Sequence, residues 1–117
     1  MPTYRVNEDG VAKARDLIDA GKYDDATEWS DAAPSAEDEN AEVEKHGYEG
    51  FGAWHLAIDP DASEETKGRY RFPYGDFSKL SRAALVAAKQ RASQNDHVEI
   101  EKAAGRLLEH LDVKREG

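Results

Sequence analysis

Basic and aromatic side chains alternate near the middle of the chain, and this combination suits the binding of an anionic group. Arg69 and Arg71 alternate with Tyr70 and Phe72. Guanidinium and ammonium groups hold phosphates or carboxylates, and aromatic rings offer faces on which a nucleobase can stack. The residues that we predict to contact such a partner are Lys67, Arg69, Tyr70, Arg71, Tyr74, Arg82 and Arg91.

The charges of the chain are sorted by position. Residues 24–66, the acidic segment, contain fourteen acids and one base, whereas residues 67–91, the basic segment, contain seven bases and one acid. The two segments therefore carry formal charges of −13 and +6. The basic segment either pairs with an acidic helix at residues 35–46 or presents a cationic face to an anionic protein or nucleic acid. Binding of nucleic acid by a chain with a net charge of −9 requires the acidic segment to lie well away from that face.

A second group of residues could form a small polar pocket beside the turn at residues 73–75. These residues are Trp54, His55, Tyr74, Asp76 and Arg82. Such a pocket would indicate a small-molecule-binding protein or a small enzyme, with His55 as a titratable group. The structural interpretation of the same residues is that His55 is a hydrogen-bonded core residue and that Asp76 caps the helix after Phe77.

Metal and nucleophile chemistry have little support in the sequence. Glu42 and His46 are four residues apart on a predicted helix, so they share a face and could hold a metal ion together with Glu49. A segment this rich in acids produces such a pair by chance, so we predict no metal site, no cofactor and no catalytic residue. The chain has no cysteine, which excludes disulfides, a thiol nucleophile and Cys-ligated zinc or iron–sulfur centres.

The elements that must position these residues are predicted to be mainly α-helical, arranged as a small single-domain helical bundle. Hydrophobic periodicity predicts helices at about 8–20, 35–46, 48–56, 78–93 and 96–112. The connection between the last two is short enough to force a C-terminal antiparallel helical hairpin. Alternation at residues 69–72 predicts at most a short two-stranded β element, with residues 4–6 as the partner strand.

Helix boundaries are predicted from individual residues. Asn7 and Ser35 are expected to be N-caps, and Asp96 with Glu99 is expected to form a capping box. Gly47 is expected to end the acidic helix, because glycine is the residue that most readily adopts the left-handed conformation found after helices.

Length and composition indicate one soluble domain, spanning residues 1–117. Apolar residues make up 38% of the chain and charged residues 35%, which leans toward disorder, but helical periodicity and ten aromatic residues indicate a thin core. Residues 24–40 are predicted to be loose and residues 113–117 to form a tail. No apolar leader or run of roughly 20 apolar residues is present, so we expect a cytoplasmic protein that does not enter membranes. The acidity itself is typical of adaptation to a high-salt cytoplasm.

Two motifs carry a resemblance to a known family. They are Gly52-Ala-Trp-His-Leu-Ala57 and the segment from Thr66 to Phe77, which contains Arg-Tyr-Arg-Phe-Pro-Tyr-Gly. Together they resemble a family of small acidic proteins of unknown activity from actinomycetes and halophilic archaea, over residues 4 to about 112. The resemblance implies one compact domain and brings no chemistry with it.

Two functions are therefore carried forward. The first is a non-catalytic interaction module that contacts an anionic protein or nucleic acid through residues 67–91. The second is a small-molecule-binding protein or small enzyme with a pocket at Trp54, His55, Tyr74, Asp76 and Arg82. A concave site walled by those five side chains would favour the second, and a flat basic face would favour the first.

Overall fold

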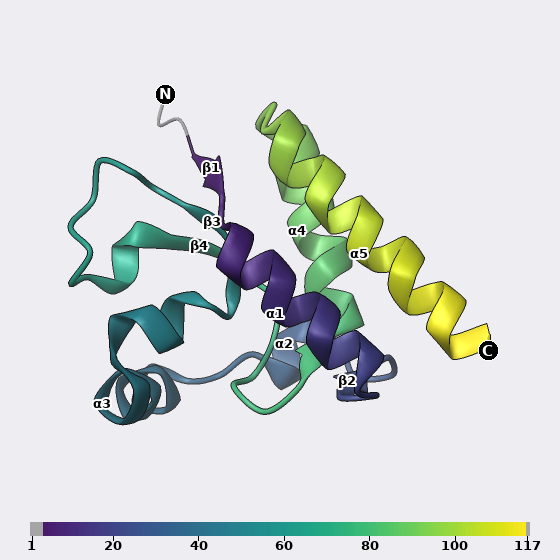
Figure 1. The fold of residues 1–117 in the computed structure, drawn as a ribbon, viewed down its shortest axis with the longest axis horizontal. Helices are drawn as coiled ribbons and strands as arrows, with labels where there is room; N and C mark the ends of the chain where they lie inside the picture. Colours follow the sequence, from purple (N-terminus) through teal and green to yellow (C-terminus); the bar gives the residue numbers. More distant parts are fainter. Residues whose placement is uncertain (1–3, 117) are drawn as a thin grey trace.

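A computed structural model describes residues 4–116, and Figure 1 shows their arrangement as helices around two small β-sheets. The elements in chain order are β1 (Arg5–Val6), α1 (Glu8–Asp19), β2 (Tyr23–Asp24), α2 (Trp29–Ala32), α3 (Ala36–Gly52), β3 (His55–Ile58), the 3-10 helix η1 (Lys67–Arg69), β4 (Tyr70–Pro73), β5 (Leu80–Ser81), α4 (Arg82–Gln94) and α5 (Val98–Glu116). The mainly α class is confirmed. Among the described residues, no helix has both the length and the apolar character needed to cross a bilayer.

Strands contribute more to the fold than predicted. An antiparallel sheet has the order β1-β3-β4, and a parallel pair joins β2 to β5. The predicted pairing of residues 4–6 with 69–72 is wrong because β3 lies between them: Val6 lies opposite Ala57, and Ala57 lies opposite Arg71 on the other side. The predicted helix at 48–56 is also wrong beyond Gly52. A short apolar run such as His55–Ile58 fits a helix or a strand, and two neighbouring strands decide between them here.

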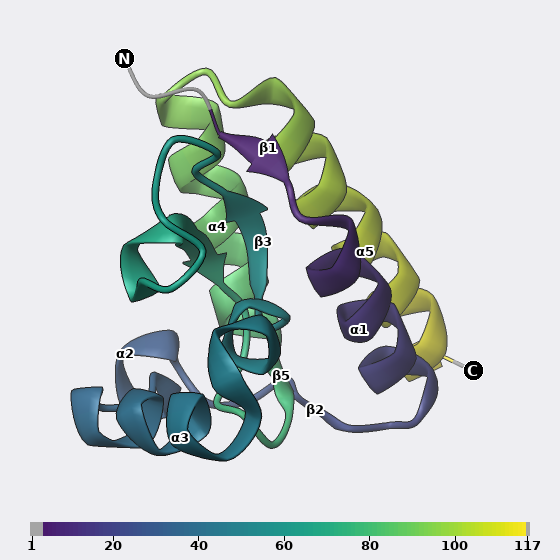
Figure 2. The same cartoon turned by 60° about the vertical axis from the view of Figure 1, so that its left-hand side comes forward.

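The helix α3 begins at its predicted N-cap and breaks at the predicted residue, although it continues to Gly52 after that break. Ser35 Oγ accepts a hydrogen bond from Asp38 N, and Asp38 Oδ2 accepts one from Ser35 N, both at 3.1 Å, which completes a capping box. Gly47, with φ 73° and ψ 176°, breaks the helical path before a second short stretch ends at Gly52. Figure 2 shows α3 on the side of the molecule away from α5.

The helix α1 begins after Asn7 as predicted, but Asn7 does not cap it through its side chain. The Asn7 amide nitrogen instead donates to the backbone oxygens of Gly52 at 2.9 Å and His55 at 3.1 Å. This buried side chain therefore joins the start of α1 to the turn before β3. Ala14 and Ile18 are buried along the inner face of α1, as the periodicity predicts.

The antiparallel hairpin of α4 and α5 is confirmed, with corrections at its ends (Figure 1). α4 begins at Arg82 rather than near residue 78, because Leu80 and Ser81 form β5 and Ser81 Oγ caps the helix by accepting from Ala84 N at 3.1 Å. Asp96 has φ 59°, which is not the extended backbone of an N-cap, so the predicted capping box is wrong. α5 continues through residues predicted to form a tail.

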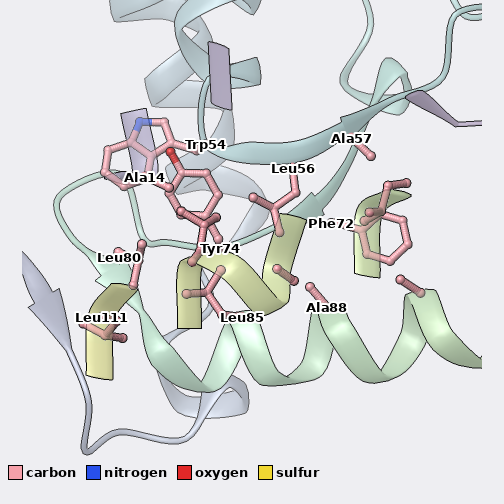
Figure 3. Packing of buried hydrophobic residues seen from close by; sticks show 14 of the residues in the cluster. Ala14, Trp54, Leu56, Ala57, Phe72, Tyr74, Leu80, Leu85, Ala88 and Leu111 are labelled. Atoms are coloured by element: carbon pink, nitrogen blue, oxygen red, sulfur yellow. The ribbon is translucent and has the colours of Figure 1, made fainter. Parts of the chain in front are cut away.

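The hydrophobic core lies between the β1-β3-β4 sheet, α1 and the hairpin. Figure 3 shows Trp54, Leu56 and Tyr74 packed toward Leu85 of α4 and Leu111 of α5. Alanines on the facing sides of the two helices, among them Ala88 and Ala104, are buried as well. Every strand of this sheet contributes to the core: Leu56 and Ala57 from β3, Phe72 from β4 and, partly buried, Val6 from β1.

Candidate functional site

Beyond the pairing of β4 with β3, the side chains of two bases in the basic segment contact the acidic segment. Lys67 Nζ is 3.6 Å from Glu39 Oε1 on α3. Arg69 Nη1 donates to the backbone oxygen of Ala62 at 2.8 Å. Within residues 4–116, Lys67–Glu39 is the one ion pair between the basic segment and the acidic helix. The two segments therefore do not close on each other as continuous faces.

Arg82 is held by the far end of the hairpin. Its Nε donates to Asp112 Oδ1 at 3.0 Å and its Nη2 donates to Asp112 Oδ2 at 3.2 Å. The hydrogen bond from Arg82 holds the pKa of Asp112 below its usual value. Such a two-pronged pair fixes the guanidinium, so Arg82 ties the start of α4 to the end of α5.

Asp76 organises a turn. Asp76 Oδ1 accepts from Ser78 N at 3.0 Å and from Lys79 N at 2.9 Å, and Asp76 Oδ2 accepts from Lys79 Nζ at 2.8 Å. Burial raises the pKa of Asp76, but the hydrogen bonds from Lys79 and Ser78 outweigh it and lower the pKa to about 2. Asp76 therefore caps this turn rather than the helix, which starts only at Arg82.

His55 and Tyr74 are parts of the core. His55 is 5% exposed, and its Nδ1 donates to the backbone oxygen of Phe51 at 3.1 Å. Burial lowers the pKa of His55 to about 4, so the imidazole is neutral near pH 7. Tyr74 is fully buried, and its hydroxyl donates to the backbone oxygen of Ala53 at 2.6 Å. Contrary to the prediction, Tyr74 has no surface with which to contact a partner.

The five residues predicted to share a pocket do not line one together, although the rings of Trp54 and Tyr74 pack against each other in the core, 5.7 Å apart. His55 and Tyr74 are covered by the surrounding chain, Asp76 faces Lys79, and Arg82 faces Asp112. Trp54 is buried too, with Lys13 Nζ 5.0 Å from the centre of its ring.

Three basic residues of the segment remain exposed: Arg71, Lys89 and Arg91. In the described part of the chain, none of them lies within ion-pair distance of an acid. Lys89 lies over α5, where a Cβ added to Gly105 would be 3.7 Å from Lys89 Cε. Arg91 lies on the β4 side of α4, as the hollow described below shows.

Arg71 is part of a stack that the sequence analysis missed. Its Cζ lies 5.5 Å from the centre of the Tyr4 ring, and the Tyr4 ring lies 4.9 Å from the His97 ring at an interplanar angle of 30°. Phe72 packs edge-on against both rings, at 6.2 Å from Tyr4 and 5.9 Å from His97. No local pattern could have found this stack, because its members come from the start of the chain, β4 and the turn of the hairpin.

A small hollow of about 60 Å³ lies between α2, β4 and α4. Apart from Arg91, the residues that line it are apolar or aromatic: Trp29, Phe72, Pro73, Ala84, Ala87 and Ala88. Phe72 therefore joins the hollow to the stack on Arg71. We call the surface formed by Arg71, Phe72, Pro73, Arg91 and Trp29 the β4–α4 face.

A larger depression, the α1–α3 groove, runs between the first turns of α1 and the second half of α3. It consists of two concavities of about 630 and 560 Å³ that share Asp9, His46, Glu49 and Ala53. One end reaches Tyr48, Glu64, Glu65, Arg69 and Tyr70, and the other reaches Lys13, Glu42, Trp54 and Phe77. Of the predicted contact residues, Arg69 and Tyr70 thus belong to this acid-rich groove.

Glu42 and His46 share a face of α3 and touch, with His46 Nδ1 2.8 Å from Glu42 Oε2. Glu49 lines the same groove. Among residues 4–116, however, no three histidine or acidic side chains are placed so as to hold a metal ion together.

Comparison of the chain with protein-family models, curated proteins and solved structures gives no match. The resemblance to a family of small acidic proteins stays a prediction. Function is therefore inferred from the residues and their geometry.

Proposed function

We propose that this protein is a non-catalytic interaction module that docks an acidic protein segment on the β4–α4 face. The observation that carries the proposal is that Arg91, an exposed base with no ion pair among the described residues, lines a largely apolar hollow, with the exposed Arg71 on the strand that forms one wall. Protein interfaces typically surround an apolar anchor point with polar residues, and arginine is enriched in them.

The hollow and the arginines suit different parts of the partner. A volume of about 60 Å³ accommodates a small aliphatic side chain. Arg71 and Arg91 can each bind a carboxylate through two parallel hydrogen bonds. An acidic segment with a valine or alanine between acids satisfies both requirements.

Single-stranded nucleic acid fits this face less well. The Tyr4 ring already has Arg71 and His97 as neighbours, and Phe72 is buried, so neither ring offers a free face to a base. Most of the affinity for nucleic acid comes from neutralising several phosphates along a strand, and the β4–α4 face supplies two bases, Arg71 and Arg91.

The proposal is tested by fluorescence anisotropy with a labelled peptide of alternating glutamate and valine. The double variant Arg71→Glu, Arg91→Glu should bind about tenfold more weakly than the wild type, because two attractive contacts become repulsive. The double variant Lys89→Glu, Arg106→Glu is the matched control, because it changes the net charge by the same amount at two exposed bases of α4 and α5 that do not belong to this face. This control should bind like the wild type.

Equal weakening by the two double variants would mean that binding depends on the overall charge of the protein and not on this face. Tighter binding of an oligothymidine of similar length would instead identify a nucleic-acid surface. Either result would overturn the proposal.

A further inference from the structure

The lining of the α1–α3 groove is acidic and favours a cationic ligand, whereas the β4–α4 face is basic and favours an anionic one. The two sites have no lining residue in common. The groove contains five carboxyl groups and two fixed cationic groups, and the carboxyl groups belong to Asp9, Glu42, Glu49, Glu64 and Glu65. A concave surface lined mainly by one sign of charge focuses the electric field and concentrates ions of the other sign.

One end of the groove already holds an ammonium group of the chain itself. Lys13 Nζ lies 5.0 Å from the centre of the Trp54 ring, within the range of a cation–π interaction. Within residues 4–116, Lys13 has no ion pair. The Trp54 end therefore shows how an aromatic face of the groove accommodates an alkylammonium group, in a concavity that Asp9, Glu42 and Glu49 also line.

The other end of the groove offers the same kinds of groups to an external ligand. Tyr48 and Tyr70 line it together with Glu49, Glu64 and Glu65. The base at this end, Arg69, donates to the oxygen of Ala62. Tyrosine faces attract cations as the tryptophan face does, although more weakly.

We propose that the α1–α3 groove binds an alkylammonium ligand, either a free polyamine or a lysine side chain of a basic protein segment. Its ammonium groups lie among Glu49, Glu64 and the two tyrosines, and its carbon chain follows the floor at Ala53. A compact metal ion is a poorer occupant, because the described carboxylates do not converge in groups of three. An elongated cation can instead contact carboxylates that are spread along the groove.

The experiment is an NMR titration of isotope-labelled protein with spermidine and, separately, with a lysine oligomer. The amides of Gly52 and Ala53 and the indole of Trp54 should shift, because these residues line the groove. Binding of spermidine alone would identify a free polyamine as the ligand, and tighter binding of the lysine oligomer would identify a basic protein segment.

Variants separate a built site from general attraction to an acidic surface. Glu49→Gln should weaken spermidine binding about fivefold, since Glu49 lines both halves of the groove. Glu44→Gln, on the exposed side of the same helix, changes the net charge equally and should have no effect. Lys13→Gln should increase the affinity, because it frees the Trp54 face for the ligand.

Three results would overturn the proposal: no shift at the groove with either ligand, equal weakening by Glu44→Gln and Glu49→Gln, or the same shifts produced by magnesium at matched ionic strength. The retained amide spectrum of each variant shows that it is folded. Because the β4–α4 face shares no lining residue with the groove, a failed spermidine titration would leave the docking proposal for that face standing, and the reverse also holds.

Discussion

At the scale of the residue, His55 makes the stability of the fold depend on pH. Burial holds the pKa of His55 at about 4, against 6.5 for an exposed histidine. The Phe51 ring, 4.7 Å away, and the Tyr70 ring, 6.0 Å away, keep water from the imidazole, and hydrogen bonding to the backbone of Phe51 and Gly52 only partly offsets the effect of burial on the pKa of His55. Between pH 6.5 and about 4, His55 is therefore protonated in the unfolded chain but stays neutral in the folded chain.

We predict that the free energy of unfolding falls with pH because of His55. Its contribution is complete above pH 6.5, decreases between pH 6.5 and about 4, and then stays constant, with a total loss of about 3 kcal/mol. Urea unfolding of the wild type and of His55→Gln at several pH values in this range gives the free energy of unfolding against pH. The effect of His55 is the difference between the slopes of the two curves. Parallel slopes in the two proteins would show that His55 is not the cause.

At the scale of the element, α1 packs its first turn directly on backbone. Asn7 donates to the oxygens of Gly52 and His55, and a Cβ built on Gly10 would overlap the oxygen of His55. The helix can approach this closely only because residue 10 has no side chain.

Two glycine substitutions should therefore have opposite effects. Gly10→Ala should lower the free energy of unfolding by about 2 kcal/mol or more, because the added methyl group meets rigid backbone. Gly105→Ala on α5 should raise it by about 0.5 to 1 kcal/mol, the usual gain from alanine in a helix, since its Cβ meets only Lys89 Cε at 3.7 Å. Urea denaturation midpoints compare the two. An unchanged or raised midpoint for Gly10→Ala would contradict the packing described for α1, and a lowered midpoint for Gly105→Ala would contradict the space described at Gly105.

At the scale of the whole molecule, a hydrogen bond and an ion pair connect the last turns of α5 to elements from the first third of the chain. His110 Nε2 lies 2.7 Å from Asp19 Oδ1 at the end of α1, and Arg115 Nε lies 2.6 Å from Asp25 Oδ2, just after β2. Together with the Arg82–Asp112 pair, they hold α5 against three other elements.

We predict that these pairs contribute modestly and in a salt-dependent way. Arg82→Ala should lower the free energy of unfolding by about 1 kcal/mol at low salt and by much less in molar salt, because both partners are partly exposed and salt screens them. Arg106→Ala, at an exposed position of α5, is the control and should change little in either condition. An equal loss for Arg82→Ala at both salt concentrations would point to packing rather than charge.

The sequence by itself determined several features that depend on neighbouring residues, although the caps predicted at Asn7 and Asp96 were wrong. The Ser35–Asp38 capping box, the break at Gly47 and the hairpin all follow from hydrogen bonds, dihedral preferences and loop length within a few positions. The sequence also offered the interpretation that His55 is a core residue, because an imidazole in an apolar run is usually buried, and His55 is buried in the structure. The types of the charged residues indicated where cationic and acidic surfaces had to be sought.

Tertiary structure decided whatever depends on distant partners. Residues 55–58 form a strand because β1 and β4 flank them, and four bases of the basic segment find acceptors elsewhere in the fold or in a tight turn. Which cations stay exposed, and which acids share a groove, is likewise set by which elements meet. The physical reason is that local hydrogen bonds constrain a few consecutive residues, whereas ion pairs and concave surfaces need the chain to bring remote residues together.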